Sequence, residues 1–290
     1  MRLATLRDGS AVAITGPVDA HELQAVHLTT LGFDGDLATL VRAGDGALAG
    51  LQDRLAEATP EPLPRERLAA PLARPGKIVA IGLNYVDHAS ETAMTPPPEP
   101  LVFTKFSTSV TGPFDDIELP EDLSVQVDYE VELGVVIGRT ARAVSRERAL
   151  EHVFGYTVLN DLSARDLQFA DQQWVRSKSF DTFCPMGPVI VTRDELPDPG
   201  ALRLGCDLNG QRVQAATTAD LIFDVPTLIS RLSRSFTLEP GDVIATGTPA
   251  GVGFTRQPPL FVRPDDLLET FVEGIGTLRN RAVAREVAKR

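Results

Sequence analysis

The chain has 290 residues, of which 43% are hydrophobic and 23% charged, as in a globular protein rather than a disordered or fibrous one. This length allows one large domain, or a main domain with a small companion, whose core needs no disulfides. The formal net charge of −12 argues against a nucleic acid partner, because phosphate backbones are held by clustered Lys and Arg. A small anionic substrate is not excluded, since a bound metal ion can invert the field inside a pocket.

Cysteine usage and the N-terminus indicate the compartment. The two cysteines, Cys184 and Cys206, lack the spacing of a thiolate metal site, and no disulfide framework is expected. The N-terminus lacks the apolar segment of a signal peptide, and no run approaches the ~20 apolar residues of a membrane span. We therefore expect a cytoplasmic protein with no membrane partner.

Residues 1–70 are expected to form a small N-terminal α/β domain. Alternation predicts strands in "RLATLRDG" and "SAVAITG", and helical periodicity follows in "DLATLVRAGDGALAGLQDRLAEA". The Pro-rich "TPEPLPRERLAAPLARPG" predicts an extended linker, because proline removes backbone donors and disfavours helix. The catalytic domain is then residues 71–290, with regular structure from about Lys77.

Short strands dominate this second domain. The segments with strand character are "KIVAIGLN", "LVFTKF", "DYEVELGVVIG", "VFGYTVLNDL", "CPMGPVIVT", "LRLGCDLNG", "QRVQAA", "DVIATGTP" and "LLETFVEGIGTLRNRAV". Helices are expected only in "SRERALEHV", "SARDLQFADQ" and "DVPTLISRLSRSF". The order lacks the steady alternation of a doubly wound sheet, so an α+β, mainly β fold with a sandwich-like or barrel-like core is predicted.

The segment "DYEVELGVVIG" puts Asp128, Glu130 and Glu132 on alternate positions of a predicted strand. Side chains two apart share one face of a strand, so the carboxylates are expected on one face, with Tyr129 and Val131 on the other. Like charges this close repel unless a proton or cation intervenes, and a divalent metal with oxygen ligands is the usual cation. A solvated edge strand protected by acidic residues explains the same spacing.

A fourth carboxylate follows in "LNDLSARDLQ". Asp161 closes an apolar stretch and precedes a predicted helix, where an N-cap that accepts backbone N–H groups near Ser163 is the simplest interpretation. A carboxylate at the end of one strand that faces a pair on another also suits a hard-cation site.

The segment "GLNYVDHASET" places His88 and Glu91 three residues apart, which brings them together on a helical turn. A carboxylate beside an imidazole fixes its tautomer and raises its basicity, so the pair could activate a water as general base. A surface pair without function is the alternative. The following "MTPPPEP" cannot continue a helix, so the turn is expected to be short.

Two lysines and a glycine-rich loop are weaker candidates. Lys178 and, with less support, Lys105 could stabilise a developing oxyanion or could simply face solvent. The loop "GDVIATGTPAGVG" has neither the P-loop nor the dinucleotide spacing, so it is expected to bring backbone and the hydroxyls of Thr246 and Thr248 near a ligand, or merely to join strands. No serine occurs in a GxSxG motif, which argues against an α/β-hydrolase.

Taken together, the sequences of five motifs and their order along the chain are specific. They are "KIVAIGLNYVDHASE", "DYEVELGVVIG", "GYTVLNDLSARDLQ", "KSFDTFCPMGPVIV" and "LEPGDVIATGTPAGVG", over roughly residues 75 to 255. In these motifs the chain resembles the fumarylacetoacetate hydrolase superfamily, in particular its smaller acylpyruvate hydrolase-type members. The resemblance implies a β-rich catalytic fold with a small N-terminal domain, a divalent ion (Mg²⁺, or Mn²⁺ or Ca²⁺) and a homodimer.

The resemblance also implies roles for single residues. Its metal ligands fall on Glu130, Glu132 and Asp161, its water-activating pair on His88 and Glu91, and its catalytic lysine on Lys178. Its substrate-binding positions fall on Lys105, Arg165, Gln168, Gly247 and Thr248. Asp128 belongs to the motif without being a ligand, and it is expected to support strand packing or to orient a neighbour. The chain departs from many relatives at Ser177 and Phe106, which puts substrate identity in doubt.

The function that the resemblance implies is hydrolysis of a carbon–carbon bond in a 2,4-dioxo acid such as an acylpyruvate. A small anionic 2-oxo acid would chelate the ion, water activated by His88 would attack the distal carbonyl, and an enolate would leave. Decarboxylation of a substrate such as oxaloacetate is the nearest rival, and isomerases, dehydratases and other lyases share the fold. A scaffold that binds metal or ligand without catalysis is the alternative of another class.

Overall fold

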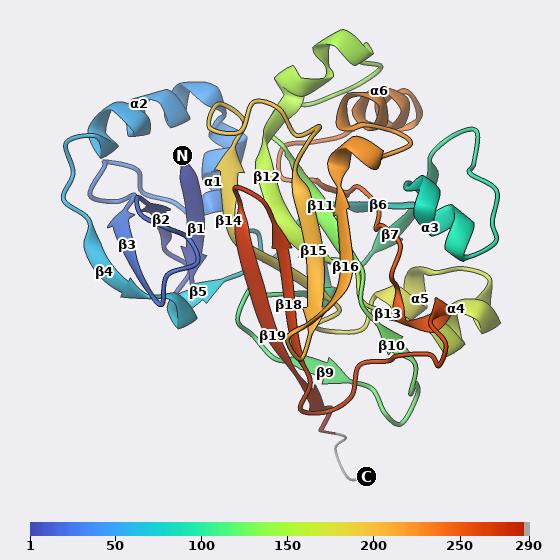
Figure 1. Ribbon diagram of the computed structural model, residues 1–290. Helices are drawn as coiled ribbons and strands as arrows, with labels where there is room; N and C mark the ends of the chain where they lie inside the picture. Colours follow the sequence, from blue (N-terminus) through green and yellow to red (C-terminus); the bar gives the residue numbers. More distant parts are fainter. Residues whose placement is uncertain (287–290) are drawn as a thin grey trace.

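The computed structural model describes residues 1–286 and is built around two β-sheets that pack against each other (Figure 1). The larger sheet contains β1 (Arg2–Leu6), β2 (Ala11–Ile14), β3 (Glu22–His27), β4 (Glu61–Pro64), β5 (Leu68–Ala69), β6 (Ile78–Gly82), β7 (Leu101–Lys105), β8 (Val110–Thr111), β11 (Val131–Ile137), β12 (Val153–Asn160), β14 (Cys184–Thr192) and β17 (Val243–Ala245). Its order is β4-β3-β2-β1-β14-β12-β11-β17-β6-β7, with β5 beside β1 and β8 beside β14.

The smaller sheet lies against β11, β12 and β14. It contains β9 (Ile117–Leu119), β15 (Arg203–Leu208), β16 (Gln211–Thr217), β18 (Leu267–Val272) and β19 (Gly276–Ala284), in the order β16-β15-β18-β19-β9. A separate two-stranded ladder joins β10 (Val127–Asp128) to β13 (Ser163–Ala164). Over the described residues both larger sheets are open, and the predicted mainly β, α+β fold is confirmed in its sandwich form.

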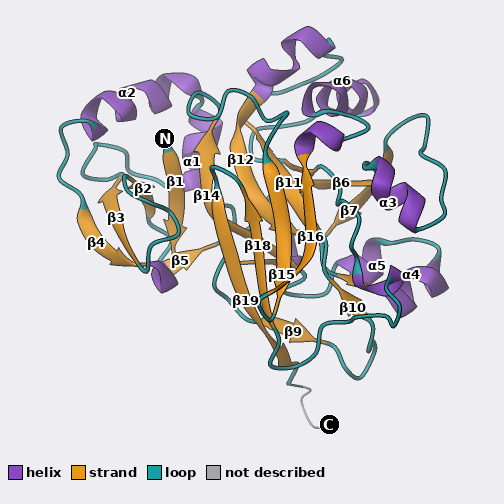
Figure 2. Ribbon diagram, viewed as in Figure 1, coloured by secondary structure: helices purple, strands orange, loops and turns teal. Residues whose placement is uncertain are grey.

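Helices lie around the sheets and do not alternate steadily with the strands along the chain (Figure 2). They are α1 (Leu37–Ala43), α2 (Asp45–Leu55), α3 (Val86–Glu91), α4 (Arg165–Asp171), α5 (Val175–Lys178) and α6 (Val225–Ser235), with short 3₁₀ turns at Arg65–Arg67, Ser107–Ser109, Arg146–His152, Thr218–Asp220 and Gly253–Thr255. The helix predicted in "SRERALEHV" is therefore a 3₁₀ helix. Among the residues described, no helix has the length and apolar character needed to cross a membrane.

Both faces of the central strands are covered, which explains their long apolar runs. On one face, Leu133 and Val158 belong to a core shared with Leu278 of the smaller sheet. On the other face, Leu159 and Ile190 belong to a core shared with residues of α1 and α2. A charged side chain on β11 is therefore buried, and the interpretation of "DYEVELGVVIG" as a solvated edge strand is wrong.

The N-terminal region joins the main sheet through its first strand. β1 pairs antiparallel with β14, with Arg2 opposite Val191. The Pro-rich segment predicted as a linker carries β4 and β5, which pair with β3 and β1, so it is not free of sheet contacts. The division into residues 1–70 and 71–290 stays a prediction about independent folding.

The acidic segment does not form one continuous strand. β10 ends at Asp128 and β11 begins at Val131, and each has a different partner, β13 and β12. Between them, the N–H of Glu130 donates to Asn160 Oδ1 at 3.0 Å and that of Val131 to Gln214 Oε1 at 2.9 Å. These side-chain acceptors replace ladder partners, and the predicted single face of three carboxylates is wrong because Asp128 belongs to another strand.

Candidate functional site

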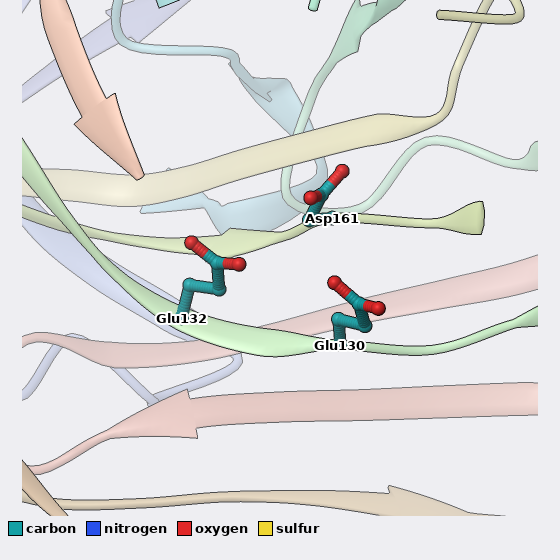
Figure 3. Close-up of side chains that lie close together, drawn as sticks. All are labelled: Glu130, Glu132 and Asp161. Atoms are coloured by element: carbon teal, nitrogen blue, oxygen red, sulfur yellow. The ribbon is translucent and has the colours of Figure 1, made fainter. Parts of the chain in front are cut away.

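Three buried carboxylates meet where β11 begins and β12 ends (Figure 3). Antiparallel pairing sets Val131 opposite Asn160, so Glu130 and Glu132 flank the point where Asp161 leaves the strand. One oxygen from each carboxylate lies within 4.8 Å of the others. The donor set is entirely oxygen, which is what Mg²⁺, Mn²⁺ and Ca²⁺ prefer.

Asp161 is not the N-cap that its position in the sequence suggests. The helix that follows, α4, begins at Arg165 with Ala164 as its capping residue and no side-chain cap. The Asp161 carboxylate instead accepts from Lys105 Nζ at 2.7 Å and from Lys178 Nζ at 2.8 Å. Its burial is complete, so it acts as a charged group inside the site rather than as the start of a helix.

Lys178 lies at the centre of the cluster. Its ammonium donates at 2.8 Å to Glu130 Oε2, Asp161 Oδ2 and Ser163 Oγ, which accounts for all three protons. Burial would lower the pKa of Lys178, but the carboxylates of Asp161 and Glu130 outweigh it and raise the pKa. The side chain is 2% exposed, so the alternative that it faces solvent is wrong.

Arg165 ties the cluster to the neighbouring loop. Its Nε donates to Asp128 Oδ2 at 2.8 Å and its Nη1 to Gln168 Oε1 at 2.8 Å. Its Nη2 lies 2.7 Å from Glu130 Oε1, but off the direction of a hydrogen bond, so that contact is an ion pair. Burial raises the pKa of Glu130, but the positive charges of Lys178 and Arg165 lower it by more. The pKa of Glu130 is therefore about 2.

Glu132 is the carboxylate that lacks a cation. Among the described residues it accepts a hydrogen bond from the Gly247 N–H at 2.8 Å and takes part in no ion pair. Burial and the carboxylates of Asp161 and Glu130 raise the pKa of Glu132 well above its usual value. An oxygen acceptor without a counterion, beside two others, fits a bound divalent cation.

The buried charges do not balance. Four carboxylates, those of Asp128, Glu130, Glu132 and Asp161, face three cations, those of Lys105, Lys178 and Arg165. With all four carboxylates ionised, the cluster therefore carries one excess negative charge, which a proton on Glu132 would remove. A divalent cation would change this to one excess positive charge, which is the sign that attracts an anionic substrate.

His88 and Glu91 form a contact pair on α3. His88 Nδ1 lies 2.8 Å from Glu91 Oε1, and Glu91 Oε2 accepts from the Gly251 N–H at 2.9 Å and from Thr255 Oγ1 at 3.1 Å. Burial would raise the pKa of Glu91, but the hydrogen bonds from His88 and Gly251 outweigh it and lower the pKa. His88 is 7% exposed, so the pair is not a surface pair.

A cavity of about 200 Å³ lies between His88 and Glu130 of the carboxylate cluster, both of which line it. Its lining consists of Ile81, Gly82, Leu83, His88, Thr92, Met94, Phe103, Glu130, Arg165, Gln168, Phe169, Trp174, Lys178, Thr248 and Phe254. The polar residues Glu130, Lys178 and Thr248 are buried and form its floor, whereas Met94 and Phe169 are exposed and form its mouth. The volume is below the ~300 Å³ at which pockets for drug-sized ligands begin, which suits a small organic acid.

The residues expected to bind substrate divide into two groups. Arg165, Gln168 and Thr248 line the cavity. Lys105 and Gly247 do not: Lys105 Nζ donates to Asp161, to the Leu162 carbonyl and to the Lys178 carbonyl, and Gly247 donates to Glu132. These two residues contact the groups that surround the cavity rather than the cavity itself.

Several lining residues were missed by sequence reasoning. The apolar wall formed by Phe103, Phe169, Trp174 and Phe254 comes from segments distant in the chain, so local spacing gives no signal for it. Of the two departures from the family pattern, Ser177 is buried and donates to the Trp174 carbonyl at 2.8 Å. Phe106 is 57% exposed and lies outside the cavity lining.

Comparison with known proteins places this arrangement in a family. The family model "Fumarylacetoacetate (FAA) hydrolase C-terminal" matches residues 77–283. The human protein named oxaloacetate tautomerase FAHD2A, mitochondrial, is 42% identical over 251 residues, which cover 85% of this chain and 79% of that protein.

Solved structures agree with the sequence match. A fumarylacetoacetate hydrolase from psychrophilic Exiguobacterium antarcticum has a TM-score of 0.84 at 37% identity, over 98% of this chain and 100% of that one. Maleylpyruvate hydrolase from Sphingobium sp. SYK-6, solved with manganese(II) and pyruvate, has a TM-score of 0.81 at 31% identity, over 99% and 100%. The chain belongs to the fumarylacetoacetate hydrolase family.

Proposed function

We propose that this protein is a divalent-metal-dependent enzyme that interconverts the keto and enol forms of a small 2-oxo acid. The observation that carries the proposal is the position of His88, held by Glu91, on the wall of the cavity whose floor holds Glu130 and Lys178. The name of the human relative, an oxaloacetate tautomerase, supports this reaction over the other members of the family.

The residues of the chain have separate tasks in this reaction. Glu130, Glu132 and Asp161 would hold the cation. Bound there, a divalent cation supplies Lewis acidity that polarises the 2-oxo carbonyl and acidifies the adjacent carbon. Glu91 accepts the Nδ1 proton of His88, which leaves Nε2 as the basic nitrogen that takes a proton from that carbon.

Lys178 contributes through its charge rather than through a free N–H. All three of its protons are donated to protein oxygens, so it stabilises developing negative charge on the substrate oxygen across space. The proton held on His88 is returned to that oxygen to complete the enol, and the reverse transfer regenerates the keto form. Each turnover therefore leaves His88 in its starting state.

Hydrolysis of a carbon–carbon bond in an acylpyruvate is the second candidate. The manganese-bound and pyruvate-bound maleylpyruvate hydrolase favours it, since that relative covers 99% of the chain at 31% identity. The same His88 base would then activate water instead of taking a carbon-bound proton. Decarboxylation needs no base and is the least supported by the His88–Glu91 pair.

The test follows the ultraviolet absorbance of the enol form of oxaloacetate with Mg²⁺, with Mn²⁺ and with chelator. We expect metal-dependent turnover that His88→Gln reduces by about 100-fold or more. His21→Gln, at an exposed histidine, is the matched control and should keep full activity. Turnover that survives chelation, or that His88→Gln leaves intact, overturns the proposal; pyruvate released from an acylpyruvate at a higher rate supports the hydrolase instead.

Three other expectations stay proposals. A homodimer rests on family resemblance, and for the cytoplasmic location expected above the name of the human relative, which includes the word mitochondrial, does not fit. The nature of the ion among Mg²⁺, Mn²⁺ and Ca²⁺ rests on the oxygen donors, which accept all three. A non-catalytic scaffold would bind metal without turnover in the test above.

A further inference from the structure

The cavity changes character from floor to mouth. Its charged lining residues, Glu130, Arg165 and Lys178, are at most 5% exposed and lie at the floor. Its mouth carries Met94, 48% exposed, and Phe169, 63% exposed. Large apolar side chains this exposed, and continuous with a charged floor, form a surface that an apolar group of a bound ligand would cover.

Two aromatic pairs build this mouth. Phe103 and Trp174 meet edge to face with centroids 5.3 Å apart, and Phe169 and Phe254 meet in the same way at 5.5 Å. Trp174 lies so close to Gly82 that a Cβ there would come within 2.6 Å of the indole. Trp174 is therefore tightly packed, whereas Phe169 contacts Phe254 and remains largely exposed.

The inner rings also cover the cations. Phe254 lies under the Arg165 guanidinium, 4.6 Å from its Cζ to the centroid, and Phe103 lies 4.9 Å from Lys178 Nζ. Both cations are already bound to carboxylates on their other side. Among the described lining residues Arg165 and Lys178 are the cations, both at the floor, so a distal group near the mouth would meet mainly the aromatic rings and Met94.

The charge of the floor leads to the same conclusion. With a divalent cation the buried cluster has one excess positive charge, which the carboxylate of a 2-oxo acid neutralises. A second carboxylate would lie beside the apolar side chains of the mouth with no cation of the chain near it, whereas an apolar group in the same place would remove those side chains from water.

We propose that this enzyme selects 2-oxo acids with one carboxylate and an apolar, preferably aromatic, distal group, held between Phe169 and Trp174. This inference rests on the proposed function and narrows its substrate class. The human relative is named for oxaloacetate, which carries a second carboxylate at the distal position. The substrate preference inferred for this chain therefore differs from the one in that name.

The experiment compares phenylpyruvate with oxaloacetate on the Mg²⁺-loaded protein. Both substrates undergo the same keto–enol conversion and differ in the group on the reacting carbon, a phenyl ring or a carboxylate. We expect kcat/KM to favour phenylpyruvate by about tenfold. Phe169→Ala should reduce this preference about fivefold, and Phe169→Lys should reverse it by placing a cation at the mouth.

Phe106→Ala is the matched control. Phe106 is 57% exposed, close to the 63% of Phe169, but lies outside the cavity, so the substrate preference of this variant should equal that of the parent protein. Calorimetric affinities for both acids give a second readout. Equal or better use of oxaloacetate, with no effect of Phe169→Lys, overturns the inference and leaves the proposed function standing. Turnover of neither acid, even with tighter binding of phenylpyruvate, overturns the proposed function and the inference that rests on it. If Phe169 instead contacts a second copy of the chain, Phe169→Ala would change the oligomeric state without changing the substrate preference, and the inference would be overturned.

Discussion

At the residue scale, Glu91 connects the base to the loop after β17. One of its oxygens contacts His88, and the other is held by Gly251 and Thr255. The spacing of three residues between His88 and Glu91 correctly predicted their contact, because i and i+3 meet on a helical turn. The partners Gly251 and Thr255 lie far along the chain, and no local pattern could have indicated them.

These contacts give a pH dependence that can be measured. The folded-state pKa of Glu91 is below its ordinary value of 4.5, so its ionisation stabilises the fold above about pH 4.5, and that stabilisation is lost as the pH falls below it. Glu91→Gln removes this titration. In urea unfolding, the difference in free energy of unfolding between the parent and Glu91→Gln should be largest at about pH 6 and shrink toward about pH 3.

The control for this experiment is Glu57→Gln, at an exposed carboxylate that forms no ion pair among the described residues. It should cost little stability at any of these pH values. A gap between parent and Glu91→Gln that stays constant with pH would mean that the ionised carboxylate is not what stabilises the loop.

At the element scale, the break between β10 and β11 separates the roles of the acidic residues. Alternation in "DYEVELGVVIG" correctly indicated that Glu130 and Glu132 lie close together, but it could not indicate the break. The break depends on Asn160 and Gln214, whose side chains replace the ladder acceptors and come from other strands. Long-range partners of this kind are invisible to a period-2 pattern.

The break lets Asp128 hold a loop instead of a cation. Its carboxylate accepts from Arg165 Nε at 2.8 Å, from the Gly253 N–H at 2.7 Å and from the Phe254 N–H at 3.1 Å. A Cβ at Gly253 would approach the Leu260 carbonyl oxygen to 1.8 Å, so the loop backbone fits closely at this point. Asp128 thus supports both the guanidinium at the cavity floor and the ring of Phe254 at its wall.

We expect Asp128→Asn to destabilise the protein more than it weakens metal binding. An amide nitrogen would face backbone or guanidinium donors, and the loss of a buried ion pair costs about 3 kcal/mol. Metal affinity, measured by calorimetry, should fall by about tenfold at most, since the contact with the ligands is indirect. A loss of metal binding as large as in Glu132→Gln would show that Asp128 is itself a ligand.

At the scale of the whole molecule, sequence patterns correctly predicted most strands after Lys77. They did not predict how the N-terminal region joins the main sheet. The strands "VFGYTVLN" and "CPMGPVIVT" are apolar throughout, which predicted burial but not the partners on each face. The pairing of β1 with β14 and the packing of α1 and α2 on the central strands supply that cover. Pairing between residues almost 190 positions apart leaves no local trace in the sequence.

The buried charge imbalance is also a property of the whole fold. The sheets hold four carboxylates and three cations together regardless of ligand. Without metal, the fold must therefore bury an unpaired negative charge or bind a proton on Glu132, whose pKa is raised, and either one costs stability near neutral pH. Binding that occurs only in the folded state adds stability, about 2.7 kcal/mol when the free metal is 100 times its dissociation constant. We therefore expect the Glu132 carboxylate to lower the stability of the metal-free protein while it is needed for metal binding.

Glu132→Gln tests this opposition. The neutral amide keeps an oxygen for the Gly247 N–H and removes the unpaired charge, so we expect the metal-free variant to melt at or above the temperature of the metal-free parent. Mg²⁺ or Mn²⁺ should raise the melting temperature of the parent and of Glu121→Gln, an exposed control, but not that of Glu132→Gln. An equal rise in all three proteins would place the cation away from Glu132, and a metal-free Glu132→Gln that melts well below the parent would mean that this carboxylate stabilises the fold rather than the bound ion.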